Sequence, residues 1–144
     1  MVSLREITKE NFWDCISLEV GDGQKEFVTS NAVSLAQSKY QPECIPLGVF
    51  SGDEMVGFVM YCIDADDGEY WIYRMMIDRA HQAKGFGTEA LKLLTERIKK
   101  DNTRHSITLG VHRESAAAVA LYRRFGFEFT GQVYGSEHIM KYVY

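Results

Sequence analysis

The chain is short of cysteine, of long apolar runs and of positive charge. Its three cysteines, Cys15, Cys44 and Cys62, are odd in number and widely spaced, so we expect reduced, mostly buried thiols rather than disulfides or a metal site. No stretch approaches the length of a membrane span and no apolar run follows a basic N-terminal segment, which favours a cytoplasmic protein with no membrane partner. The formal net charge of −4 argues against nucleic-acid binding, which needs a basic surface.

What the chain does contain is the composition of one globular domain. Hydrophobic residues make up 46% of its 144 residues and charged residues 25%, which is enough apolar surface to build a core. Apolar patterning predicts strands at residues 2–7, 46–50, 55–63, 70–77, 106–111, from 127 onward and at 139–144. Helices are predicted from an N-cap at Thr8 to residue 18 or 20, and at 25–39, 88–100 and 115–125. We therefore expect a single α/β domain over residues 1–144, built around one mixed sheet.

Residues 82–88 carry two glycines, Gly85 and Gly87, between the predicted strand 70–77 and the predicted helix that follows. A turn that leads into a helix presents unpaired backbone N–H groups and the positive end of the helix dipole. Such a turn binds phosphate or pyrophosphate, and glycine lets the ligand approach the backbone closely. The alternative is a tight turn with no ligand. A nucleotide site of the P-loop kind is disfavoured, because no Lys-Ser/Thr pair follows.

A second signature lies about thirty residues downstream, in the run Ser115-Ala-Ala-Ala-Val-Ala-Leu-Tyr122-Arg-Arg-Phe-Gly-Phe127. With Gln-x-x-Gly-x-Gly before it, in this order and spacing, the chain resembles the GNAT superfamily of N-acetyltransferases. The resemblance implies the GNAT fold, a mixed central sheet of about six to seven strands flanked by about four helices. It also implies acetyl-CoA as co-substrate and a small-molecule amine as acceptor.

The resemblance assigns roles to particular residues. Tyr122 matches the tyrosine of the family's Leu-Tyr-x-x-x-Gly-Phe motif and is the expected general acid for the thiolate leaving group. The family usually has Asn where this chain has Ser115, which retains one hydrogen bond and is expected to cap the helix. The expected cofactor-binding residues are Met75, Met76, Ile77, Gln82, Ala83, Lys84, Gly85, Phe86, Gly87, Thr88, Ser115 and Arg124.

The first half of the chain resembles bacterial spermine/spermidine acetyltransferases more specifically, for example in Leu18-Glu19-Val20, Asn31, Tyr40 and residues 56–61. Its acidic loops agree with a polycationic acceptor, since separated carboxylates can hold ammonium groups. The expected substrate-binding residues are Glu19, Asp22, Glu26, Glu69 and Tyr73. Solvated loops are the alternative for any one of these acids.

The general base stays unassigned. Related polyamine acetyltransferases often have a carboxylate late in the fourth strand, where this chain has Tyr73 and Arg74, and we interpret His81 and His112 as surface or structural residues. Rival functions are acetylation of another small amine, an aminoglycoside or a protein N-terminus, or a CoA-binding regulatory module without catalysis. A homodimer is possible by analogy with the family.

Overall fold

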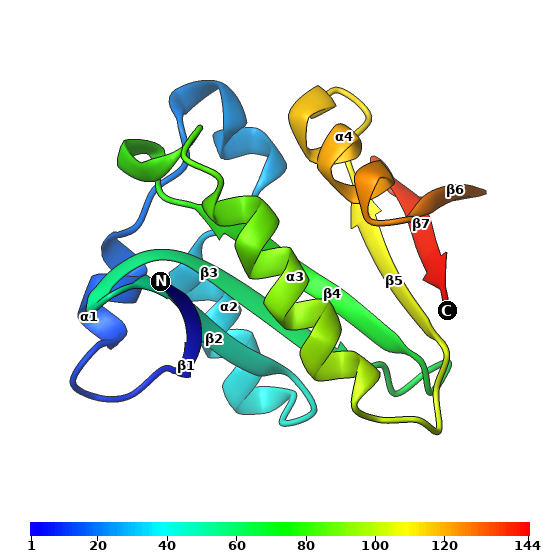
Figure 1. The fold of residues 1–144 in the computed structure, drawn as a ribbon, viewed down its shortest axis with the longest axis horizontal. Helices are drawn as coiled ribbons and strands as arrows, with labels where there is room; N and C mark the ends of the chain where they lie inside the picture. The colour runs from blue at the N-terminus through cyan, green and yellow to red at the C-terminus, as the bar shows by residue number, and fades with distance from the viewer.

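Seven strands form one mixed sheet in the order β1-β2-β3-β4-β5-β7-β6 in the computed structural model, which describes residues 1–144 (Figure 1). The strands are β1 (Val2–Glu6), β2 (Ile45–Ser51), β3 (Glu54–Ile63), β4 (Tyr70–Ile77), β5 (Ser106–Val111), β6 (Glu128–Tyr134) and β7 (Glu137–Val143). The helices are α1 (Phe12–Ser17), α2 (Asn31–Tyr40), α3 (Phe86–Lys99) and α4 (Ala116–Arg124), with 3-10 turns η1 (Asp22–Phe27) and η2 (Arg79–His81). The expected fold class is confirmed. No helix is long and apolar enough to cross a membrane.

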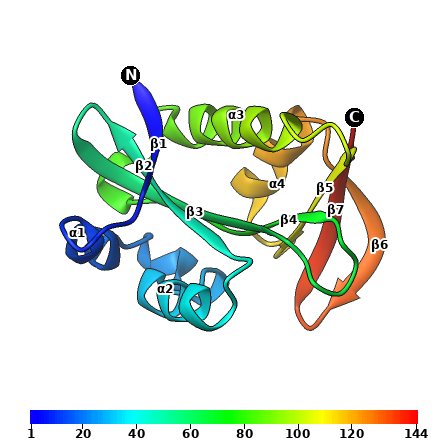
Figure 2. The ribbon, with the colours of Figure 1, turned by 90° about the horizontal axis from the view of Figure 1, so that it is seen from below.

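The helices cover both faces of the sheet, with α1 and α2 on one face and α3 and α4 on the other (Figure 2). Strand β3 supplies both cores because its side chains alternate between the faces. Val59 and Tyr61 pack on the α3 side, whereas Phe58 and Met60 pack with Cys15 on the α1 side. The three cysteines are buried and unpaired, as expected from the sequence.

Strands β4 and β5 run parallel but are paired at one end only. The ladder joins residues 70–72 of β4 to residues 107–109 of β5 and ends there, while β4 continues to Ile77 beside β3 (Figure 1). The pairing with β3 becomes irregular at the same place, since Met60 pairs with Arg74 but Tyr61 pairs with Ile72. Tyr73 is therefore the extra residue of a β-bulge, which bends the strand. The result is an opening between the two central strands.

The first predicted helix is shorter than the sequence indicated. The α-helix begins at Phe12, and residues 8–11 form a turn before it. Thr8 caps this turn as predicted, since its hydroxyl accepts from the Glu10 N–H (3.3 Å) while its own N–H donates to the Asn11 side chain (2.7 Å). The helix ends at Ser17, since Leu18 is extended with ψ of 137°.

The second predicted helix, residues 25–39, is broken in the middle. The turn η1 ends at Phe27, and Val28 is extended with φ of −132° and ψ of 124°. Ser30 then caps α2 by accepting a hydrogen bond from the Val33 N–H (3.3 Å). A β-branched residue favours the extended conformation and serine favours the N-cap, so both local preferences act against a continuous helix. The break leaves residues 26–29 free to line the opening beside β4.

Candidate active site

The larger of two adjoining cavities, about 620 Å³, lies at the N-terminus of α3, where β4 leaves β5. Its loop contains two left-handed residues, Ala83 (φ 62°) and Gly85 (φ 86°). The first hydrogen bond of the helix runs from the Glu89 N–H to the Gly85 carbonyl, so the N–H groups of residues 86–88 have no partner within the helix. With the helix dipole, these groups make the cavity suited to an anion.

The structure brings together nearly all the residues that the sequence predicted for the cofactor. Residues lining this cavity include Met75, Met76, Ile77, Gln82, Ala83, Gly85, Phe86, Gly87, Thr88, Ser115 and Arg124. Arg124 adds a positive charge close to the helix N-terminus, since its guanidinium donates to the Thr88 hydroxyl (3.4 Å). Lys84 is exposed and does not line the cavity. Ser115 stands at the N-cap of α4, but its side chain makes no capping hydrogen bond.

Gln82 ties the loop to two other parts of the cavity wall. Its side-chain amide donates to the Ile77 carbonyl (3.0 Å) at the end of β4 and to the Gln24 side chain (2.9 Å) in η1. The Gln24 oxygen also accepts from the Gly21 N–H (3.2 Å). The side chain of Gln82 therefore fixes the shape of the cavity, while its backbone forms part of the lining. Sequence reasoning assigned Gln24 no part in the site.

The edge of β4 that faces the opening offers backbone groups at Met75. The Asp78 N–H bonds to the Val56 carbonyl of β3, so by alternation Met76 also faces β3, whereas Met75 and Ile77 face the opening. The Ile77 carbonyl is occupied by Gln82, and the Tyr73 carbonyl accepts from Arg74 (2.9 Å). Met75 is thus the residue whose N–H and C=O are available to an extended ligand lying along the strand.

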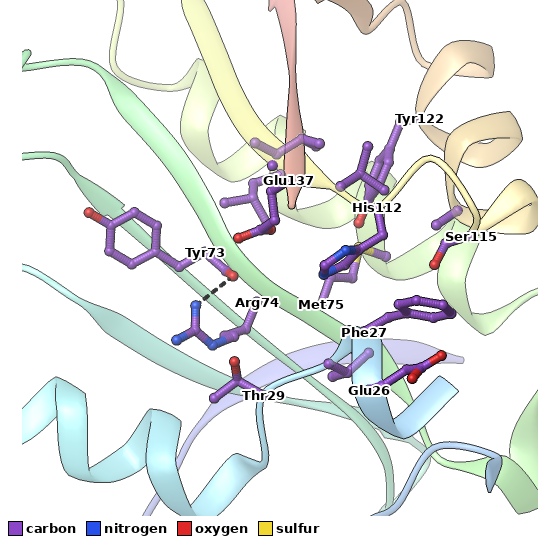
Figure 3. A pocket seen from close by; sticks show the side chains of 16 residues that line it. Glu26, Phe27, Thr29, Tyr73, Arg74, Met75, His112, Ser115, Tyr122 and Glu137 are labelled. Carbon is purple, nitrogen blue, oxygen red and sulfur yellow. Dashed lines mark hydrogen bonds between the residues drawn. The ribbon is translucent and has the colours of Figure 1, made fainter. Parts of the chain in front are cut away.

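A second cavity, about 240 Å³, is drawn in Figure 3. It adjoins the first, and Tyr122 lines both. Tyr122 comes from α4 and is 8% exposed, and no protein group bonds to its hydroxyl. Burial, with a smaller contribution from the negative charge of Glu137, raises the pKa of Tyr122 to about 12. The phenol therefore keeps its proton at neutral pH and can donate it to a group that becomes negative beside it.

Three charged side chains, Glu26, Glu137 and Arg74, surround the second cavity (Figure 3). Glu137 begins β7 and lies over Gly110 of β5, where a Cβ would come within 2.9 Å of its Oε2. A residue without a side chain at position 110 therefore makes room for the carboxylate. Arg74 donates only to neutral acceptors, namely Ser34 Oγ, Gln37 Oε1 and the Tyr73 carbonyl.

The structure places only some of the predicted substrate-binding residues at the second cavity. Glu26 and Tyr73 line the second cavity, although the Tyr73 hydroxyl donates to Asp64 (2.5 Å). Glu19 and Asp22 line neither of the two cavities, and both lie within ion-pair distance of Lys25, at 4.0 and 3.3 Å. Glu69 lies at the other end of β4, where it accepts a hydrogen bond from Ser106 (3.1 Å), and it also lies outside both.

Several lining residues were not expected from the sequence, among them Glu137, His112 and His81. Glu137 follows a hairpin turn and lies beyond the second motif, and only the pairing of β7 with β5 brings it to Gly110. His112, interpreted above as a surface or structural residue, faces the second cavity and packs against Phe27 with ring centroids 5.1 Å apart. Its place at the end of β5, directly before the second motif, was the one available signal. His81 lines the first cavity and lies 3.5 Å from Glu54.

Residues 8–127 match the acetyltransferase (GNAT) family, and the chain therefore belongs to that family. It is an acyltransferase of the class that uses acetyl-CoA as its acyl donor.

Two kinds of relative have different acceptors in their names. The spermine/spermidine N(1)-acetyltransferase of Bacillus subtilis is 29% identical over 146 residues, which cover 96% of both chains. A spermidine N-acetyltransferase from Vibrio cholerae, solved with CoA and spermine, aligns with a TM-score of 0.74 at 17% identity over 97% of this chain and 92% of that one. An aminoglycoside acetyltransferase solved with coenzyme A aligns with a TM-score of 0.81 at 19% identity over 99% and 95%. At such identities the two solved structures establish only the fold.

Proposed function

We propose that this enzyme transfers the acetyl group of acetyl-CoA to a primary amine of a polyamine such as spermidine or spermine. The observation that carries the proposal is the meeting of the two cavities at the Tyr122 hydroxyl. One has an anion-binding helix terminus, and the other contains the carboxylates of Glu26 and Glu137. Carboxylates in a cavity favour a cationic acceptor by direct charge attraction. The name of the Bacillus subtilis relative supports the same acceptor class.

The first cavity fits coenzyme A. The unpaired N–H groups of residues 86–88, together with Arg124, would hold the pyrophosphate. The N–H and C=O of Met75 would pair with the amide groups of the pantetheine arm, and so direct its sulfur toward Tyr122. The side chain of Lys84 is in solvent, so it would contribute only a distant favourable charge to the binding of the pyrophosphate.

Acetyl-CoA supplies a thioester, which an amine can cleave directly. We assign Glu137 to receive the acceptor ammonium group and take its proton, since an alkylamine with a pKa of about 10.4 is not nucleophilic while it is protonated. As the new C–N bond forms and the C–S bond breaks, Tyr122 donates its proton to the leaving sulfur, and the second proton lost by the nitrogen restores the phenol. Glu26 attracts the same ammonium group from the η1 side of the cavity.

The proposal is tested by the rate of CoA-thiol release from acetyl-CoA with a panel of amines: spermidine, spermine, putrescine, lysine, an aminoglycoside and a short peptide. We expect the highest kcat/KM with spermidine or spermine. Preference for the aminoglycoside or the peptide would overturn the polyamine assignment and keep the mechanism. Tight CoA binding without turnover of any amine would favour a regulatory module instead.

Gly87→Ala should separate cofactor binding from stability. A Cβ at position 87 would lie 3.6 Å from Leu121 and 3.8 Å from Ile77, which are ordinary contacts, and alanine is the better helix former. The added methyl group would nevertheless occupy the place where a pyrophosphate approaches the backbone. We expect the Kd for CoA, measured by calorimetry, to rise about tenfold, which is a loss of about 1.4 kcal/mol, while Tm stays level or rises.

The matched control is Gly21→Ala, because a Cβ there would meet only Gln24 Oε1 at 3.8 Å and residue 21 does not line the cavity. Unchanged CoA affinity in Gly87→Ala would place the pyrophosphate elsewhere.

A further inference from the structure

A third cavity, about 220 Å³, adjoins the second cavity (the acceptor cavity) on the side away from Tyr122. The two share Ile72, Tyr73, Arg74, Gly110 and Glu137, so they meet where Glu137 lies over β5. The transfer of the acetyl group, as proposed above, makes no use of this space. A long acceptor whose reacting end lies in the acceptor cavity would extend into the third cavity. The other end of the acceptor would then contact the walls of the third cavity.

The outer wall of the third cavity is a pair of aromatic rings. Trp71 of β4 and Tyr134 at the end of β6 stack with ring centroids 6.5 Å apart and an interplanar angle of 25°, although their strands are not neighbours in the sheet. The Trp71 indole N–H donates to Asp67 (2.8 Å), which fixes the orientation of the ring. The neighbouring Tyr73 hydroxyl donates to Asp64. Two carboxylates are therefore hydrogen-bonded to aromatic side chains that line this cavity.

The two aromatic rings are suited to binding an ammonium group. A cation within about 6 Å of an aromatic centroid is attracted by the ring face, and both Trp71 and Tyr134 line this cavity. The attraction is strengthened by the negative charges of Glu137, which lines the cavity, and of Asp67, which is hydrogen-bonded to Trp71.

The positive charge of Arg74 opposes a cation at the junction of the two cavities. No carboxylate lies within salt-bridge distance of its guanidinium, whose partners are all neutral. An ammonium group is therefore disfavoured next to Arg74, and uncharged methylene groups fit the junction better. The two favourable positions for positive charge are then the acceptor cavity, beside Glu137 and Glu26, and the aromatic wall.

We propose that the third cavity binds the distal ammonium group of the acceptor, with Trp71 and Tyr134 as the recognition surface. This inference rests on the proposed polyamine function and makes it more specific. The enzyme selects an amine that carries a second positive charge, separated from the reacting nitrogen by a methylene chain that crosses the junction.

The test compares three acceptors of equal length in wild-type enzyme. One is spermidine, the second is the analogue in which a methyl group replaces the terminal amine that does not react, and the third is the analogue in which a carboxylate replaces that amine. CoA-thiol release gives kcat and KM for each. We expect spermidine to have the highest kcat/KM, with most of its advantage in KM.

Tyr134→Leu is the first variant, since Tyr134 is 58% exposed and its loss leaves both cores intact. We expect it to lower kcat/KM for spermidine about fivefold through KM and to lower the ratio of kcat/KM for spermidine to that for the methyl-terminated analogue by a similar factor. Trp71→Leu should do the same about tenfold, and Trp71→Phe should retain most of the selectivity. Tyr40→Leu, at a residue that is 81% exposed on α2 and lines none of the three cavities, is the control and should change neither value.

The outcomes separate this inference from the function on which it rests. Turnover of spermidine with an unchanged ratio in Tyr134→Leu and Trp71→Leu, both folded by their Tm, would overturn the distal site and leave the polyamine function standing. A preference for the carboxylate-terminated acceptor would assign the third cavity to Arg74 and an anionic group, and would also overturn the proposal. No turnover of any polyamine would overturn both.

Discussion

Tyr122→Phe is expected to lower kcat about 100-fold while leaving the affinity for CoA and Tm nearly unchanged. No protein group bonds to the hydroxyl, so its removal leaves no protein group without a partner. The loss is at the low end for general acid catalysis, because a thiol with a pKa of about 8.5 can leave as thiolate at neutral pH. Steady-state CoA release with spermidine measures the effect.

The pH dependence gives the same variant a second readout. The pKa of Tyr122 is raised to about 12 by burial and then by Glu137, so the proton needed for catalysis is present at every pH below that value. Between about pH 6 and 9 the wild-type and Tyr122→Phe profiles should therefore run parallel, with both rising as the acceptor amine loses its proton. A falling limb in this range that is present in wild type and absent in the variant would contradict the assignment.

Glu137→Gln is expected to lower kcat/KM for polyamines about 10- to 100-fold. Glutamine keeps the shape that fits over Gly110 but has no negative charge for the acceptor ammonium and cannot take its proton. Both kcat and KM should change if Glu137 has both roles, and the loss should shrink when the assay pH approaches the pKa of the amine. The measurement is kcat and KM for spermidine over a range of pH.

Two further variants make the Glu137 result specific. Glu128→Gln lies on β6 of the same hairpin, is exposed and lines none of the three cavities, so it should behave as wild type. Gly110→Ala leaves the carboxylate in the chain but forces it aside, since the new Cβ would meet its Oε2 at 2.9 Å. It should lower kcat/KM in the same direction. A full rate in Glu137→Gln with a large loss in Glu26→Gln would move the acceptor contact to η1.

The helix start at residues 85–88 and the strand before it were predictable because their determinants are local. Apolar runs specify β4 and β5, and two glycines before a periodic segment specify the turn into α3. The prediction of one continuous second helix was wrong for an equally local reason. Val28 prefers an extended backbone and Ser30 prefers the N-cap position, and both preferences were given less weight than the pattern of the whole segment. Local signals also indicated Glu26, but they could not separate it from Glu19 and Asp22, which pair with Lys25.

By itself the sequence determined the family, the order of elements and the glycine-containing turn into α3, because short-range spacing encodes each of these. Only the tertiary structure decided which charged side chains line the second cavity. Glu137 reaches the site because β7 inserts between β5 and β6 in the sheet, and Trp71 meets Tyr134 although 63 residues separate them in the sequence. Such contacts depend on strand order and on the opening between β4 and β5. These are properties of how the whole chain buries its two cores, and no single segment encodes them.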